Sequence, residues 1–177
     1  MRRLILPVLG ALLLVAACVK PDQPRMRVMG LRPVYVSELA FYDIGNRGEQ
    51  PLKHTGTIYI WQQYFLVAEY GKGIHVYDRT DPSLPVYITF LNIPGCADFT
   101  LSGTTLFADN GFDVLSIDVK DLRAIKLNTV LKNATKNSRT MPPGYTGYFE
   151  CHDPAKGYFI GWDSTLLDNP HCRVGIE

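Results

Sequence analysis

Short apolar segments separated by turn-forming residues fill the chain from residue 57 to residue 132. The segments are rich in isoleucine, valine, tyrosine and phenylalanine, and glycine, asparagine, aspartate and proline stand between them. β-branched and aromatic residues favour strands, so the pattern predicts antiparallel strands rather than helices. We expect strands at Thr57–Trp61, Tyr64–Glu69, Gly73–Asp78, Val86–Asn92, Cys96–Leu101, Thr105–Asp109, Val114–Asp118 and Leu127–Lys132.

Two of these segments are apolar at every position instead of alternating with polar residues. They are Ile58–Trp61 and Phe65–Ala68. A strand that faces water on one side alternates apolar and polar side chains, whereas a strand covered on both sides does not. The sequence therefore predicts sheets that are buried on both faces.

A repeat of forty residues organises the same region. Sliding the chain by forty residues without a gap aligns seven identical pairs, which are Leu66/Leu106, Ala68/Ala108, Gly71/Gly111, Asp78/Asp118, Asp81/Asp121, Thr89/Thr129 and Leu91/Leu131. A period of twenty to fifty residues is typical of repeat architectures. The spacing predicts two four-stranded antiparallel units in succession.

One stretch of the first unit resembles a known repeat. Gly73–Asp78 is an apolar strand that ends in aspartate, Asp81–Val86 reads D-P-S-L-P-V, and the next strand closes on Pro94-Gly95. This pattern resembles the LVIVD repeat of bacterial surface propellers. The second unit keeps Asp118 and Asp121 but has leucine and isoleucine in place of the two prolines. The resemblance implies a propeller-type fold outside the inner membrane, and it brings no catalytic residue with it.

We therefore expect an all-β protein that forms a partial β-propeller. Residues 33–133 should hold two four-stranded antiparallel blades, and residues 134–177 a linker and an irregular C-terminal hairpin segment. Closed propellers have about four to eight blades, and only two are recognisable here. We expect the chain to be the N-terminal part of a longer propeller protein; the alternative is an open segment whose exposed strand edges need a partner.

The N-terminus has the features of a secretory leader. Arg2 and Arg3 precede an apolar run of about twelve residues, too short to span a bilayer. Val15–Cys18 resembles the bacterial lipobox, so residues 1–17 are expected to be a signal peptide and Cys18 to be the lipidated residue. Membrane attachment would then be through lipid, with outer-membrane placement favoured because Val19 is not aspartate. The alternative is an ordinary leader cleaved after Ala17. Residues 18–32 are expected to be a tether.

An exported chain with cysteines beyond Cys18 is expected to form a disulfide. Cys151 and Cys172 flank an apolar strand, and a bond between them would close a loop of about twenty residues. The alternative is a zinc site, because each of these cysteines has a histidine beside it. Adjacent residues of an extended chain point in opposite directions, which disfavours that site. Cys96 is expected to be a small buried side chain.

Charge and motifs narrow the function. The formal net charge is +1, and it becomes −1 without the two leader arginines, so nucleic-acid binding is not expected. Hydrolase, zincin and phosphate-loop motifs do not occur in the sequence, and we expect no catalytic residue, metal or cofactor. The recurring aspartates Asp78, Asp81, Asp118 and Asp121 are expected to bind backbone amides two residues further on rather than calcium.

These observations favour binding over catalysis, in a cell-envelope protein with a protein or glycan partner. Tyr145, Tyr148 and Trp162 are candidate binding residues, although core packing is the expected fate of Trp162. The alternative is a fragment of a propeller enzyme with an acidic central site, in which Glu69, Asp109 and a histidine would converge in one pocket.

Overall fold

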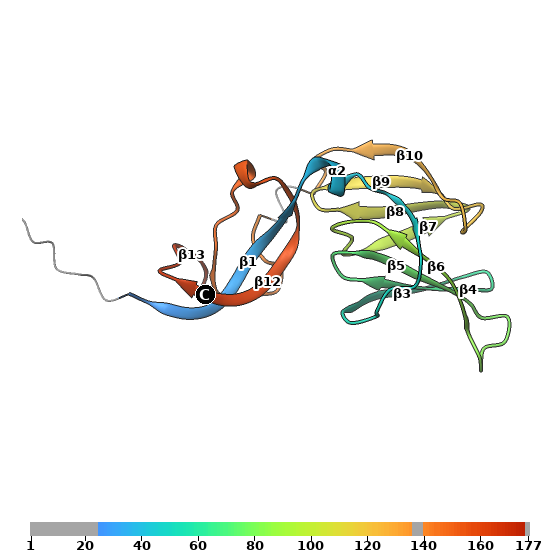
Figure 1. The fold of residues 1–177 in the computed structure, drawn as a ribbon, viewed down its shortest axis with the longest axis horizontal. Helices are drawn as coiled ribbons and strands as arrows, with labels where there is room; N and C mark the ends of the chain where they lie inside the picture. Colours follow the sequence, from blue (N-terminus) through green and yellow to red (C-terminus); the bar gives the residue numbers. More distant parts are fainter. Residues whose placement is uncertain (1–24, 136–139, 176–177) are drawn as a thin grey trace, which may run out of the picture.

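A computed structural model describes residues 25–135 and 140–175 and shows an all-β protein built of three sheets (Figure 1). Cys18 lies outside the described residues, as do the leader and the first part of the expected tether. Within the described part, no helix is long and apolar enough to cross a membrane.

The first sheet has five strands in the order β2-β6-β5-β4-β3, and the second has four in the order β10-β9-β8-β7; every neighbouring pair in both is antiparallel. The first sheet consists of β2 (Gly45–Arg47), β3 (Thr55–Trp61), β4 (Tyr64–Glu69), β5 (Gly73–Asp78) and β6 (Val86–Asn92). The second consists of β7 (Phe99–Ser102), β8 (Thr105–Asn110), β9 (Asp113–Asp118) and β10 (Lys126–Leu131).

The third sheet brings together the two ends of the described chain. Its strands are β1 (Arg27–Val36), β11 (Gly147–Phe149), β12 (Tyr158–Asp168) and β13 (Cys172–Val174), in the order β12-β1-β11-β13. β1 runs antiparallel to β12 and parallel to β11. Two short helical segments, α2 (Glu38–Phe41) and η2 (Pro154–Lys156), lie next to β1 and β12 in the sequence.

The third sheet corrects two predictions from the sequence. The second half of the expected tether, from Arg27 to Arg32, belongs to strand β1 and pairs with Asp168 to Asp163 of β12. The C-terminal segment is not a self-contained hairpin, because β11 pairs with β13 while β12, which lies between them in the sequence, pairs with β1. The pairs between β1 and β12 join residues more than 120 positions apart, so local patterns cannot reveal them.

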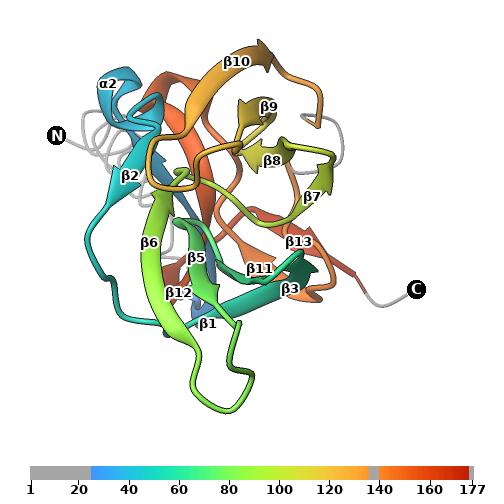
Figure 2. The same cartoon turned by 90° about the vertical axis from the view of Figure 1, so that its right-hand side faces the viewer.

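A hydrophobic core lies between the first and second sheets, which are stacked one above the other in Figure 1 and lie in front of β1 and β12 in Figure 2. Its fully buried members include Leu66, Ile74 and Leu91 from the first sheet and Leu106, Leu115 and Ile117 from the second. Cys96 is buried in the same core, as the sequence predicts. Two side-chain hydrogen bonds, Thr57 to Asp98 and Trp61 to the Gly103 carbonyl, hold β3 beside β7.

The outer edges of the two sheets are joined through Asn46 of β2. Its Nδ2 donates to the Leu122 carbonyl at 2.8 Å, and its Oδ1 accepts from the Ile125 amide at 3.0 Å. Proline has no N–H and could not make the second bond. Ile125, which stands where the first unit has a proline, therefore provides a contact between the two sheets.

The strand registers also correct the gapless alignment of the two units. β4 and β5 are joined by three residues between Glu69 and Gly73, whereas β8 and β9 are joined by two between Asn110 and Asp113. When the hairpins are matched, each residue of β3 and β4 corresponds to the residue forty-one positions later, in β7 or β8. Each residue of β5 and β6 corresponds to the residue forty positions later, in β9 or β10. Leu106 occupies the position of Phe65 and not of Leu66, since a slip of one residue turns a strand side chain to the opposite face.

The prediction that both faces of the sheets are buried is wrong for part of each sheet, since Phe107 and Leu131 of the second sheet are exposed. Ile58 and Ile60 of β3 are 55% and 58% exposed on the face that points away from the core. The segment at residues 48–54 covers the other end of that face, where the amides of Lys53 and His54 donate to the buried Glu69 carboxylate.

The aspartate turns follow the expected geometry. Asp78, Asp81, Asp118 and Asp121 each accept a hydrogen bond from the backbone amide two residues further on, at 2.8 to 2.9 Å. These bonds account for the recurrence of the aspartates in both units. The described residues bring together no group of three or more histidine, cysteine, aspartate or glutamate side chains that could hold a metal ion.

Candidate binding site

An aromatic cleft lies where the third sheet meets the second. It has a volume of about 460 Å³ and is lined by Phe41, Tyr42, Phe112, Asp113, Lys132, Asn133, His152, Pro154, Gly157, Tyr158 and Phe159. Five separate segments of the chain supply these residues, so the cleft exists only when the second and third sheets are assembled.

Local structure positions the aromatic side chains of the cleft. Ser37 caps the first turn of α2 by accepting from the Ala40 amide, and this short helix places the buried Phe41 beside Tyr42. The tight turn at Gly111 places Phe112 parallel to Phe159 of β12, with ring centroids 4.8 Å apart. Tyr158 packs on Phe41 at 4.7 Å. The cleft wall therefore contains two groups of packed aromatic rings, one around Phe41 and Tyr158 and one around Phe112 and Phe159.

A carboxylate lies beside these rings. Asp113 is 6% exposed; it accepts a hydrogen bond from the Tyr42 hydroxyl at 2.9 Å and another from the Asn133 amide at 2.7 Å. A carboxylate has about four acceptor positions, so two such bonds leave capacity for a ligand. The Lys132 ammonium lies 5.6 Å from the centre of the Tyr42 ring and adds a donor at the rim.

Both tyrosines of the cleft are held in their neutral form. Burial and the hydrogen bond to Asp113 raise the pKa of Tyr42 well above its usual value of 10. The hydrogen bond from the Tyr158 hydroxyl to Glu38 raises the pKa of Tyr158 as well. Near neutral pH the cleft thus presents neutral tyrosine hydroxyls beside the Asp113 carboxylate and the Lys132 ammonium.

The three candidate binding residues from the sequence lie outside this cleft. The Tyr145 hydroxyl donates to the Tyr148 carbonyl at 3.3 Å, and Arg173 covers the Tyr148 ring at 5.1 Å. Trp162 packs edge-on against Phe149 and Phe159, and it lines a smaller cavity of about 270 Å³ with Tyr70 and Ile160. Phe159 lines both cavities and is the residue that connects them.

The sequence does not identify Tyr42, Phe112, Asp113, Lys132 or Tyr158 as site residues. Phe41-Tyr42 and Tyr158-Phe159 are adjacent aromatic pairs, which is the one feature that could have drawn attention to them. Their convergence depends on the pairing of β1 with β12, which the sequence pattern does not reveal.

The acids considered for an enzymatic site are used within their own sheets. Glu69 accepts the amides of Lys53 and His54, and Asp109 accepts the amide of Asp98 at 3.0 Å. His75 is the histidine near Glu69, with 4.0 Å between its Nε2 and a Glu69 oxygen, and both side chains are fully buried. Neither ring nitrogen of His75 has a hydrogen-bond partner among the described residues.

We expect the His75→Leu variant to be more stable than the wild type by about 1–2 kcal/mol, because it removes two buried nitrogens without partners. Leu115 occupies the matching position of the second sheet, so leucine suits this site. Burial lowers the pKa of His75 below its usual 6.5, although Glu69 and Glu49 raise it and Lys72 adds to the lowering. Protonation therefore favours the unfolded chain, and wild-type stability should fall as the pH drops below about 6.5.

Urea denaturation between pH 5 and pH 8 tests this expectation. The gain from His75→Leu should grow as the pH falls, whereas Glu69 should respond at lower pH. Burial raises the pKa of Glu69, but the amides of Lys53 and His54 and the nearby Lys72 outweigh it and lower the pKa. A loss of stability in the variant at every pH would contradict the expectation and would give His75 a stabilising role.

No protein-family model matches the chain, and no curated protein or solved structure matches it significantly.

Proposed function

We propose that this protein is a lipid-anchored binding module of the bacterial cell envelope, built from propeller-type blades, and that the aromatic cleft binds a glycan. Cys18 carries the lipid in this proposal, and the outer membrane is the favoured location. The single observation that carries the ligand class is the cleft, in which stacked aromatic rings stand beside the Asp113 carboxylate and the Lys132 ammonium.

The composition of the cleft suits a sugar ring. Such a ring has apolar C–H faces that pack against aromatic side chains, and its hydroxyl groups need both donors and acceptors. Tyr158 and Phe112 supply aromatic surface, Asp113 supplies acceptor oxygens and Lys132 supplies a donor. Ligand sites of this kind are mostly apolar concave surfaces with a few convergent polar groups.

The stacking of the first two sheets supports the propeller-type description. Each has four successive antiparallel strands, and β3 lies beside β7 as inner strands do around a propeller axis. One residue of each β5–β6 and β9–β10 pair is bulged, at Ile88 and Asn128, which are forty residues apart.

A glycan array probed with the mature protein, followed by calorimetry on the hits, tests the binding proposal. Lys132→Met and Tyr158→Ala should each weaken glycan binding at least about tenfold, since each removes a group of the cleft. The matched control is Tyr148→Ala, which removes an aromatic ring outside the cleft. In cells, Cys18→Ala should move the protein from the membrane fraction to the soluble fraction.

Two results would contradict the proposal. One is an array with no glycan that binds. The other is binding that the control Tyr148→Ala weakens as much as the cleft variants do. Unchanged thermal unfolding of Lys132→Met, whose side chain lies at the surface, separates loss of binding from loss of folding.

A further inference from the structure

The contact between the first and second sheets joins two different faces of the repeated unit. The first sheet presents Leu66, Ala68, Ile74, Val76 and Leu91 to the core. The second sheet presents Phe99, Leu106, Ala108, Leu115 and Ile117. In the corrected register, Leu106 corresponds to Phe65 and Ile117 to Tyr77. We call the face of the first sheet that carries Leu66 and Ile74, and the equivalent face of the second sheet, the front. The opposite face, which carries Leu106 and Ile117 in the second sheet, is the back. The core is therefore formed by the front of the first sheet and the back of the second.

The back of the first sheet is exposed to solvent, whereas the equivalent face of the second sheet is buried in the core. Ile58 and Ile60 correspond to Phe99 and Leu101. Phe99 is 6% exposed in the core, whereas Ile58 and Ile60 are 55% and 58% exposed. Phe65 and Tyr77 continue this half-exposed apolar surface across β4 and β5, beyond the end covered by residues 48–54.

The front of the second sheet is likewise exposed to solvent, whereas the equivalent front of the first sheet is packed in the core. Phe107 corresponds to Leu66, Val114 to Ile74, and Leu131 to Leu91. Phe107 is 39% exposed and Leu131 is 62% exposed. Ser116 and Thr129 lie between them on this face. The chain thus exposes one front and one back, which are the two kinds of surface that already pair inside it.

We propose that a second copy of this chain docks on these surfaces, head to tail. The front of the second sheet in one copy, around Phe107 and Leu131, covers the back of the first sheet in the next, around Ile58 and Ile60. The contact continues the sheet stacking seen inside the chain, and it is independent of the aromatic cleft. Because the two surfaces differ, the contact is heterologous and can propagate from copy to copy until a ring closes or a filament forms.

Sedimentation of the mature protein, extracted in a mild detergent, tests this docking. The wild type should form oligomers whose size rises with concentration. Ile60→Glu blocks the back and Phe107→Glu blocks the front, and each should weaken association at least about tenfold, since each places a charge in an apolar contact. Leu39→Glu is the matched control, because Leu39 is an apolar residue of α2 that is 87% exposed.

Mixing the two blocked variants distinguishes head-to-tail docking from other contacts. Each variant keeps one intact surface, so an equimolar mixture of Ile60→Glu and Phe107→Glu should form a one-to-one dimer that neither forms alone. A wild type that stays monomeric at about 100 μM overturns the proposal, as does a mixture that stays monomeric. Equal weakening by Leu39→Glu also overturns it. Circular dichroism and thermal unfolding confirm that each variant is folded.

Discussion

Gly111→Ala is expected to destabilise the protein by about 2–4 kcal/mol, the largest effect of any single methyl group that we consider. Gly111 has a φ of +58°, where alanine costs roughly 1 kcal/mol. Its added Cβ would overlap with the Phe159 carbonyl oxygen and lie 3.0 Å from the Phe41 ring. The backbone of β12 would have to move away from the β8–β9 turn, which adds a packing cost of about 1–3 kcal/mol.

Gly103→Ala provides a matched control for this expectation. Gly103 also sits in a two-residue turn of the second sheet and has a φ of +60°, but nothing lies within 4 Å of the position of its Cβ. Its variant should lose only the roughly 1 kcal/mol of the backbone conformation. Urea denaturation of both variants isolates the contact with β12. Equal losses would show that the third sheet does not depend on this close approach.

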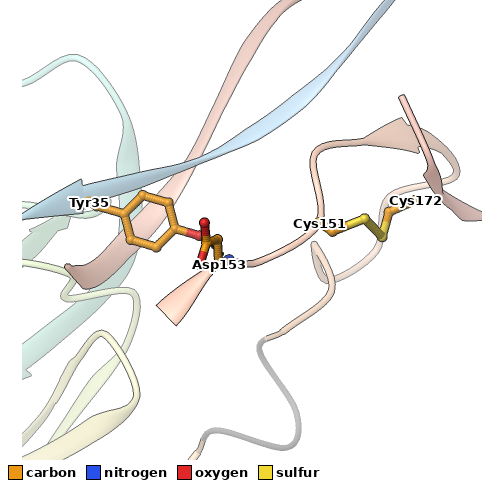
Figure 3. Close-up of a disulfide and its surroundings, with 4 residues drawn as sticks. All are labelled: Tyr35, Cys151, Asp153 and Cys172. Carbon is orange, nitrogen blue, oxygen red and sulfur yellow. Dashed lines mark hydrogen bonds between the residues drawn. A yellow bond between two sulfur atoms is a disulfide. The ribbon is translucent and has the colours of Figure 1, made fainter. Parts of the chain in front are cut away.

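Removing the disulfide between Cys151 and Cys172 is expected to cost about 3 kcal/mol, the value for closing a loop of about twenty residues in the unfolded chain. The structure contains this bond, as predicted from the sequence, with the two cysteines 21 positions apart (Figure 3). It links β13 to the segment after β11, and the loop that it closes contains all of β12. Figure 3 also shows Asp153, whose amide donates to the Tyr35 hydroxyl at 2.7 Å and ties this loop to β1.

The double variant Cys151→Ala/Cys172→Ala, compared with the wild type in the presence and absence of dithiothreitol, provides the measurement. The reductant should lower the unfolding midpoint of the wild type to about that of the double variant and should leave the variant unchanged. A double variant as stable as the oxidised wild type would mean that β12 is held by β1 without help from the bond.

Strands β3 to β10 could be predicted because they form hairpins with their neighbours in the sequence, whereas β2, which pairs with the more distant β6, was not predicted. β4, β5 and β6 begin and end at the predicted residues, since turn-forming residues bound each one. The prediction starts β7 three residues early at Cys96, because apolar character alone does not separate a strand from a buried loop. The gapless alignment at forty residues places Leu66 over Leu106, but the strand registers put these two residues on opposite faces of their sheets.

The aromatic cleft could not be predicted for a related reason. Its residues come from segments as far apart as Tyr42 and Tyr158, and their convergence requires the third sheet. The sequence does predict the bond between Cys151 and Cys172 and the aspartates that shape the turns. These are properties of short segments. The cleft depends on strand pairing between distant segments, which local patterns in one sequence do not reveal.

The pairing of β1 with β12 also determines the order in which the molecule can fold. During synthesis from the N-terminus, Arg27–Val36 is made before its partner Tyr158–Asp168, which follows more than 120 residues later. Strands β3 to β6 and β7 to β10 pair with their neighbours in the sequence and can form in the meantime, because contacts that close short loops form faster. β1 must therefore wait for its partner until Tyr158–Asp168 has been synthesised, and its exposed edge is the part of the nascent chain that most needs protection from aggregation.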